Sequence, residues 1–343
     1  MKALVTVIFF IAVSHLFAQP RPVSFYLIDK RVTTIPVAAP DVLARQLISP
    51  YKQDIEKVRS IFRWITENIA YDTKAYHDPE GAYAGLWEAA GFSPEADRQK
   101  DYNDRIVQKV LAEKRAICDG YSRLFKTLCD YAKIKCEIIT GYIRWSSDAI
   151  GQMTNRQHAW NAVYVDDGWH LVDATWASGY CNEAVTEFTK RYDEFFFFTG
   201  PVEFFNDHYP TDTKWSLLPV TPSLTQFYNF PFYYPAFYSF KIIDVKPTAG
   251  YLDVTAENRR VRIELETKDR AKDLYIYESP EIQRDSISSD SLSGEVIDDF
   301  YTPKYKIENN RILYVYEIQS EKTEKLNIVY NGKLILTYGV RFR

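Results

Sequence analysis

The stretch that decides the fold is Arg115–Ser122, with the sequence RAICDGYS. It places Cys118 where a loop is expected to turn into a helix. Apolar residues recur downstream at steps of three and four, which predicts a helix over 121–132. A thiol at a helix N-terminus faces unpaired backbone N–H groups and the positive end of the helix dipole. Both favour the thiolate, which is the nucleophilic form of cysteine. Cys118 is therefore our candidate nucleophile.

Two downstream segments supply a base and an acid. His158 lies in 157–163 (QHAWNAV), and Asp173 lies in 169–176 (WHLVDATW). An imidazole titrates near neutral pH, so it can hold and deliver a proton. A carboxylate that accepts one ring N–H fixes the tautomer of that imidazole. Cys118, His158 and Asp173 thus have the residue types and the chain order of a thiol catalytic triad.

These segments resemble the transglutaminase-like superfamily, and within it the branch of kyphoscoliosis-peptidase-like and cytokinesis-protein-like proteins. The resemblance covers residues 40–235 and rests on linked motifs at 58–65 with 68–72, 118–121, 158–161, 169–176, and 195–198 followed by 208–210 and 215–218. The order Cys, His, then acid or amide is shared with papain-like proteases. The resemblance implies an α+β papain-like core, in which the helix that bears the cysteine packs on an antiparallel sheet.

The sequence divides into four parts: a signal peptide (1–18), an N-terminal arm (19–50), a transglutaminase-like domain (51–237) and a small, immunoglobulin-like β-sandwich (238–343). A length of 343 residues favours more than one domain, because single cores stop growing near ~250 residues. After residue 240 apolar and polar residues alternate as in half-buried strands. The pair Asn331–Gly332 is typical of a type I′ hairpin turn.

Further elements are expected before the nucleophile. Asp54–Asn68 is the clearest helix, with one continuous apolar stripe, and 104–113 is a second helix that leads into Cys118. The segment 72–104 between them is expected to be a loop with short helical pieces. Residues 25–28 alternate and could form a strand or part of the arm.

The N-terminal segment has the pattern of a secretory signal. It combines Lys2, an apolar run over 4–13 and the small residue Ala18 before an expected cleavage at Gln19. The run is shorter than the ~20 apolar residues of a membrane span, and no other segment is apolar enough for an integral span. We therefore expect a secreted or periplasmic protein. The net charge of −4 and the lack of long basic runs argue against a nucleic-acid partner.

The chain has four cysteines, at positions 118, 129, 136 and 181. Export would permit disulfides, but four cysteines in this length are not a disulfide framework. We therefore expect Cys129, Cys136 and Cys181 to be buried, apolar thiols. At most one bridge could form among them without the nucleophile.

The hairpin that carries the base and the acid allows its register to be predicted. A two-residue turn at Asp167–Gly168 would set Ala162 opposite Asp173, on the face that also carries His158. The two triad members would then be four residues out of direct register. A bulge, a bend or a wider loop would have to close that gap. His170 falls on the opposite face and is not expected to act as the base.

Attack on an amide also needs donors for the oxyanion. The backbone N–H of Cys118 is one, and the side-chain candidates for a second are Trp64, Asn68, Trp87 and Gln99. The resemblance implies a tryptophan without identifying which one. We also expect Trp160, Trp169 and Trp176 to pack around the site, Asp119 to point away from the sulfur, and His208 to be structural.

Aromatic residues crowd the segment 227–240. They could bind a sugar or peptide ligand. The alternative is that they seal two domains together, and we favour it because aromatic burial dominates interfaces.

Two classes of function remain open. The first is an exported cysteine peptidase or transglutaminase-like acyltransferase that acts on a protein or peptide substrate. Hydrolysis and crosslinking of glutamine to an amine pass through the same acyl-enzyme. The second is a non-catalytic, extracytoplasmic binding or scaffold protein on the same fold. No acidic loop has the ligand spacing of a calcium site, so we expect no obligatory metal and no cofactor.

Overall fold

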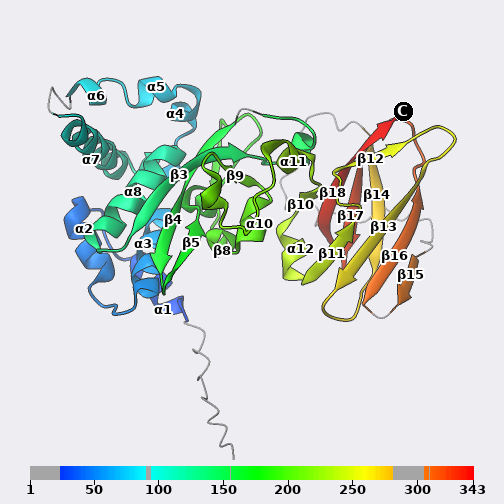
Figure 1. Cartoon of the computed structure of the whole chain (residues 1–343). Helices are drawn as coiled ribbons and strands as arrows, with labels where there is room; N and C mark the ends of the chain where they lie inside the picture. The colour runs from blue at the N-terminus through cyan, green and yellow to red at the C-terminus, as the bar shows by residue number, and fades with distance from the viewer. Residues whose placement is uncertain (1–23, 90–93, 155, 281–304, 309) are drawn as a thin grey trace, which may run out of the picture.

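The computed structural model describes residues 24–89, 94–154, 156–280, 305–308 and 310–343, which form two bodies that follow each other along the chain (Figure 1). The first combines helices with an antiparallel sheet, and the second is built from two sheets. The expected signal peptide 1–18 lies outside the described residues. Among the described helices, none combines the length and the apolar character needed to cross a membrane.

The first body contains ten α-helices over its described residues: α1 (Tyr26–Val32), α2 (Pro40–Ile48), α3 (Asp54–Asn68), α4 (Thr73–His77), α5 (Pro79–Ala82), α6 (Leu86–Ala89), α7 (Glu95–Glu113), α8 (Cys118–Tyr131), α9 (Ala174–Ser178) and α10 (Pro201–Phe205). Its main strands are β3 (Cys136–Ile143), β4 (Gln157–Val165), β5 (Gly168–Val172), β8 (Phe197–Thr199) and β9 (His208–Pro210). Short strands pair β1 (Ala70–Tyr71) with β2 (Arg115–Ala116) and β6 (Gly179–Cys181) with β7 (Phe188–Lys190). Single 3₁₀ turns are η1 (Ser147–Ala149), η2 (Glu194–Phe196) and η3 (Thr213–Ser216).

The centre of this body is helix α8 packed on the sheet. The strands run in the order β8-β5-β4-β3-β9, and all neighbours are antiparallel. The helix lies against β3 and β4, and its apolar stripe of Tyr121, Leu124, Phe125 and Leu128 is fully buried. Burial of such a stripe, rather than helix propensity, supplies most of the stability of a helix of this length. The predicted α+β class is confirmed.

The elements before α8 differ from the sequence expectations in two places. Helix α3 has the predicted bounds, but α7 starts at Glu95 rather than at 104. Residues 25–28 do not form a strand, because helix α1 starts at Tyr26. Over its described residues, the segment expected to be an arm contributes α1 and α2, whose Val32 and Leu43 are fully buried in the same core as α3 and α8.

The hairpin β4–β5 turns one residue earlier than predicted. Val165 pairs with Gly168, so the turn residues are Asp166 and Asp167, both with positive φ (49° and 63°). Aspartate tolerates the left-handed region better than most residues, which lets Asp-Asp take the place expected for Asp-Gly. The ladder pairs Asn161 with Val172. Extended by one residue, it places Asp173 opposite Trp160 instead of opposite Ala162. The offset between the two triad positions therefore falls from four residues to two on the same face.

The second body is a β-sandwich. Its elements are α11 (Leu224–Asn229), β10 (Phe232–Tyr233), α12 (Pro235–Ser239), β11 (Ile242–Lys246), β12 (Tyr251–Val254), β13 (Arg260–Thr267), β14 (Leu274–Pro280), β15 (Tyr305–Glu308), β16 (Arg311–Glu317), β17 (Thr323–Tyr330) and β18 (Lys333–Phe342). One sheet has the order β10-β18-β17-β14 with β12 beside β18, and the other has the order β11-β13-β16-β15. Asn331 and Gly332 form the predicted turn between β17 and β18, both with positive φ.

The aromatic stretch 227–240 joins the two bodies. Phe227 and Tyr228 are buried against Phe205 and Tyr209 of the first body, whereas Phe237 belongs to the core of the sandwich. This distribution supports the sealing role over a ligand platform. The second body also touches the loop that leads into β4, because the Tyr251 hydroxyl donates to the Ile150 carbonyl at 2.7 Å.

Candidate active site

Cys118 is the first residue of α8. The preceding Ile117 has an extended backbone and no side chain caps the helix, so the N–H groups of the first turn are left for another acceptor. The cysteine itself is half-buried. Asp119 is turned along the helix, where its carboxylate accepts a hydrogen bond from Arg123 Nε at 2.7 Å. The helix start thus offers a thiol and free N–H donors together. The neighbouring carboxylate of Asp119 is paired with Arg123.

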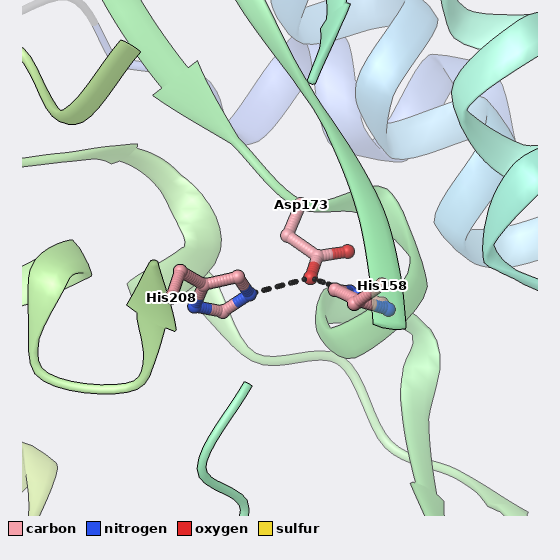
Figure 2. Close-up of side chains that lie close together, drawn as sticks. All are labelled: His158, Asp173 and His208. Atoms are coloured by element: carbon pink, nitrogen blue, oxygen red, sulfur yellow. Dashed lines mark hydrogen bonds and ion pairs between the residues drawn. The ribbon is translucent and has the colours of Figure 1, made fainter. Parts of the chain in front are cut away.

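His158 and Asp173 meet directly. His158 is the second residue of β4 and is 6% exposed, and Asp173 follows the last residue of β5 and is fully buried. Nε2 of His158 lies 2.6 Å from Oδ2 of Asp173, and a dashed line joins the two side chains in Figure 2. Nδ1 is therefore the ring nitrogen of His158 that remains for the thiol. The shorter offset in the hairpin and the departure of the chain into α9 bring the two side chains together.

Asp173 is held by four hydrogen bonds. Its Oδ1 accepts from the backbone N–H groups of Thr175 (2.8 Å) and Trp176 (3.0 Å), which makes it the N-cap of α9. Its Oδ2 accepts from His158 and, at 3.1 Å, from Nε2 of His208. A carboxylate whose oxygens all meet donors is fixed in position and stabilised as the anion.

The charges of the pair stabilise each other. Burial by itself would lower the pKa of His158, but the charge and hydrogen bond of Asp173 outweigh it and raise this pKa to about 10. A hydrogen bond and the charge of Cys118 act on His158 in the same direction. Burial would raise the pKa of Asp173, but His158 and His208 hold it well below its usual range. The structure thus brings all three predicted site residues together.

His208 was expected to be structural because the sequence shows no chemical partner for it. The structure supplies two partners, since both of its ring nitrogens meet carboxylates. Nε2 bonds to Asp173 and Nδ1 lies 2.5 Å from Oδ1 of Asp207 (Figure 2 shows the first contact). His208 is 1% exposed, and these carboxylates raise its pKa against the effect of burial. The signal available in the sequence was the adjacent acid, Asp207.

Aromatic rings enclose the two histidines. Measured between ring centroids, Trp176 lies 5.5 Å from His158 and 4.6 Å from His208. Trp160 lies 6.2 Å from His158 and 5.1 Å from His208. Trp169 was expected here as well, but it packs against Trp215 and Tyr164 instead. His170 lies apart from the site as predicted, with Nε2 near the Val165 carbonyl and its ring stacked on Phe198. The enclosure keeps water from the charged groups, which strengthens their interactions.

Three of the four proposed oxyanion donors are engaged elsewhere. Trp64 donates to the Ile35 carbonyl, Asn68 donates to the Trp64 carbonyl, and Gln99 donates to Asn103. Trp87 packs on Tyr102 and under the guanidinium of Arg98. None of these contacts directs a donor to Cys118.

Two tyrosines that the sequence analysis did not single out lie near the thiol. The charge of Cys118 acts on both Tyr71 and Tyr83, whose pKa values are raised mainly by burial. A Cβ on Gly120 would come within 2.9 Å of the Tyr83 hydroxyl, so glycine is needed there to admit this ring. The groups that approach Gly120 this closely are all side chains.

A surface pocket of about 240 Å³ adjoins the helix start. It is lined by Ala116 and Ile117, the two residues before Cys118, and by Tyr83 and charged side chains that include Lys74 and Arg115. A pocket beside a nucleophile can hold the part of a substrate that flanks the reacting bond.

The remaining cysteines are thiols in this structure. Cys129 is fully buried and Cys136 is 2% exposed, as expected, whereas Cys181 is half-buried. Burial raises the pKa of Cys129 well above that of an ordinary thiol and raises that of Cys181 to about 11. Both are therefore expected to be poor nucleophiles beside Cys118.

His158, Asp173 and His208 are also close enough to be tested as metal ligands, since their ligand atoms lie within 4.8 Å of one another. Their contacts, however, are direct hydrogen bonds that converge on one oxygen of Asp173. Ligands of zinc lie ~2.0–2.2 Å from the ion, so each of these hydrogen bonds would have to break to admit a zinc ion. The donors and acceptors satisfy each other as they stand.

Comparison with known proteins assigns the part of the chain that holds Cys118, His158 and Asp173 to a family. A sequence profile described as the transglutaminase-like superfamily matches residues 41–174. Kyphoscoliosis peptidase of Mus musculus is 32% identical over 237 residues, which cover 68% of this chain and 32% of that protein. The Homo sapiens protein is 33% identical over 226 residues (65% and 31%), and hillarin of Drosophila melanogaster is 30% identical over 248 residues (67% and 27%). The chain spans about a third of the length of these curated relatives.

Proposed function

The chain carries a transglutaminase-like domain of the kyphoscoliosis-peptidase branch, and we propose that this domain is a thiol acyl-transfer enzyme acting on protein or peptide amides. The observation that carries the proposal is the buried pair of His158 and Asp173, 2.6 Å apart, with Cys118 at the start of α8 close enough to act on the same imidazole.

The chemistry follows from the roles of the three groups. The thiolate of Cys118 attacks the substrate carbonyl and forms a C–S bond, while the carbonyl oxygen becomes an oxyanion near the first N–H groups of α8. Collapse of this intermediate breaks the C–N bond, and the imidazolium of His158 gives its proton to the departing amine. The neutral imidazole then takes a proton from water or from a second amine as that nucleophile attacks the thioester. Collapse of the second intermediate breaks the C–S bond and frees the thiolate beside the imidazolium of His158, which restores the starting ion pair.

The identity of the second nucleophile decides the reaction. Water gives hydrolysis, and an amine gives crosslinking, from one acyl-enzyme. The charged pocket beside Ile117 supports a polar polypeptide segment as the substrate.

The test is incubation of the full chain with a library of glutamine peptides and amines, read by mass spectrometry. We expect products that form with the wild type and not with Cys118→Ala. Cleavage or deamidation would identify a hydrolase, and amine adducts would identify a transglutaminase. A library left equally unchanged by both proteins would favour the non-catalytic scaffold instead.

We also propose that the protein is exported, on the strength of the apolar run over 4–13. N-terminal sequencing of material from the extracytoplasmic fraction is expected to begin near Gln19. Material that still begins with Met1 would refute this proposal.

A further inference from the structure

Beyond Asp173, the buried polar contacts continue through two more residues. His208 starts strand β9, and Asp207 precedes it. The distances are 3.1 Å from Nε2 of His208 to Asp173 and 2.5 Å from Nδ1 to Asp207. An imidazole with both nitrogens directed at carboxylates must carry a proton on each, because a lone pair facing a carboxylate oxygen would repel it. The geometry therefore favours the imidazolium form of His208.

We propose that His208 and Asp207 extend the triad as positioning residues, with His208 held as a buried cation that shares the Asp173 carboxylate with His158. The inference rests on the proposed thiol chemistry. It assigns to His208 an influence on the ionisation of Cys118 and His158, in addition to a role in packing.

The surroundings support a charged His208. The rings packed on it come from β4, α9, η2 and α10: Trp160, Trp176, Phe196 and Phe204. None of these is titratable. The charged groups that act on it are Asp207 and Asp173, and both raise its pKa. The His158 ring lies 5.5 Å away on the other side of the shared carboxylate.

Arg144 ends the line of charges. It is 1% exposed, and its guanidinium donates to the carbonyl oxygens of Asn206, Phe230 and Pro231. Burial lowers the pKa of Arg144 to about 10, while the nearby Asp207 acts to raise it. Asp207 therefore lies between two cations, as Asp173 does. From the thiolate to Arg144 the charges alternate, which is how buried charges are tolerated.

The sign of the effect on the site can be worked out. Loss of the positive charge at His208 makes the field at the thiolate more negative, so the thiolate should form at higher pH. Two charges ~5 Å apart in a partly polar interior interact strongly enough to shift the pKa of either group by more than one unit. Cys118 lies beyond His158, so a smaller upward shift of roughly half a unit or more is expected there.

The experiment measures the pH dependence of Cys118 alkylation by iodoacetamide in the full chain. In His208→Gln, which keeps an N–H donor but no charge, the midpoint is expected to move up by roughly half a unit or more. Asp207→Asn is nearly isosteric and removes the carboxylate that Nδ1 of His208 faces. His208 should then lose its positive charge, so the midpoint should shift in the same direction. The double variant should shift it no further than the larger single shift. The matched control is His170→Gln on the opposite face, with no shift expected.

A direct measurement accompanies it. Ring ¹⁵N NMR of the histidine-labelled chain should show two N–H groups on His208 at pH 8 in the wild type, and one in Asp207→Asn. A single ring N–H on wild-type His208 would overturn the proposal, as would unchanged alkylation midpoints in both Asp207→Asn and a folded His208→Gln. If His158→Ala also leaves the alkylation unchanged, the proposed thiol chemistry itself fails, so the two failures can be told apart.

Discussion

Replacing His158 by alanine is expected to abolish turnover and to slow the alkylation of Cys118 by roughly tenfold at pH 6. Single members of serine protease triads contribute ~10⁴–10⁶ in kcat, and a thiol that lost its imidazolium partner should suffer similarly. Alkylation falls less because two effects oppose each other. At pH 6 only ~0.3% of an ordinary thiol is ionised, but its thiolate is intrinsically more nucleophilic.

The measurement is iodoacetamide labelling at pH 6, followed by peptide mapping of the wild type, His158→Ala and Asp173→Asn. Asp173→Asn should slow the labelling less than His158→Ala, because it keeps the imidazole and weakens only its orientation. Cys129 and Cys181 are internal references, since burial raises the pKa of both thiols. Equal labelling of Cys118 in the three proteins would mean that no triad operates, and the scaffold function would then be the better hypothesis.

The site residues could be predicted because their signals are local. Cys118 stands at a helix start. His158 lies in one strand of a short hairpin and Asp173 directly follows the other, so motif and periodicity suffice. The error in register came from the turn. Asp166 and Asp167 both adopt positive φ, a conformation for which Asp-Gly is the stronger sequence signal.

The role of His208 could not be predicted in the same way. Its contact with Asp173 joins residues 35 positions apart, at the start of β9 and just after β5, and these two strands are not neighbours in the sheet. Alternation within a strand carries no information about such a contact. The ion pair between Asp29 of α1 and the buried Arg59 of α3, at 2.6 Å, could not be predicted for the same reason. Tertiary contacts of this kind decide which exposed-looking polar residues become buried.

Replacing Asp173 by alanine is expected to destabilise the first body by about 3–5 kcal/mol at pH 5, because two buried imidazolium rings lose their shared carboxylate. Loss of the N-cap of α9 contributes ~1 kcal/mol of this. Asp173→Asn should cost less, since its amide oxygen can still accept from Thr175 and Trp176. Urea unfolding followed by tryptophan fluorescence measures this body specifically, because all seven tryptophans lie between residues 64 and 215.

The cost should depend on pH, and its sign follows from the shifted groups. The raised pKa of His158 contributes stability that is complete below its unfolded value of ~6.5 and is lost as the pH rises through about 10. The lowered pKa of Asp173 contributes stability that is complete above ~3.9 and is lost in more acidic solution. The difference between the wild type and Asp173→Ala should therefore be largest between pH ~4 and ~6.5 and smaller at pH 9. Asp193→Ala is the matched control, because Asp193 caps η2 through Phe195 without a histidine partner. If Asp173→Ala cost no more than this control at pH 5, the carboxylate would be acting as a helix cap alone.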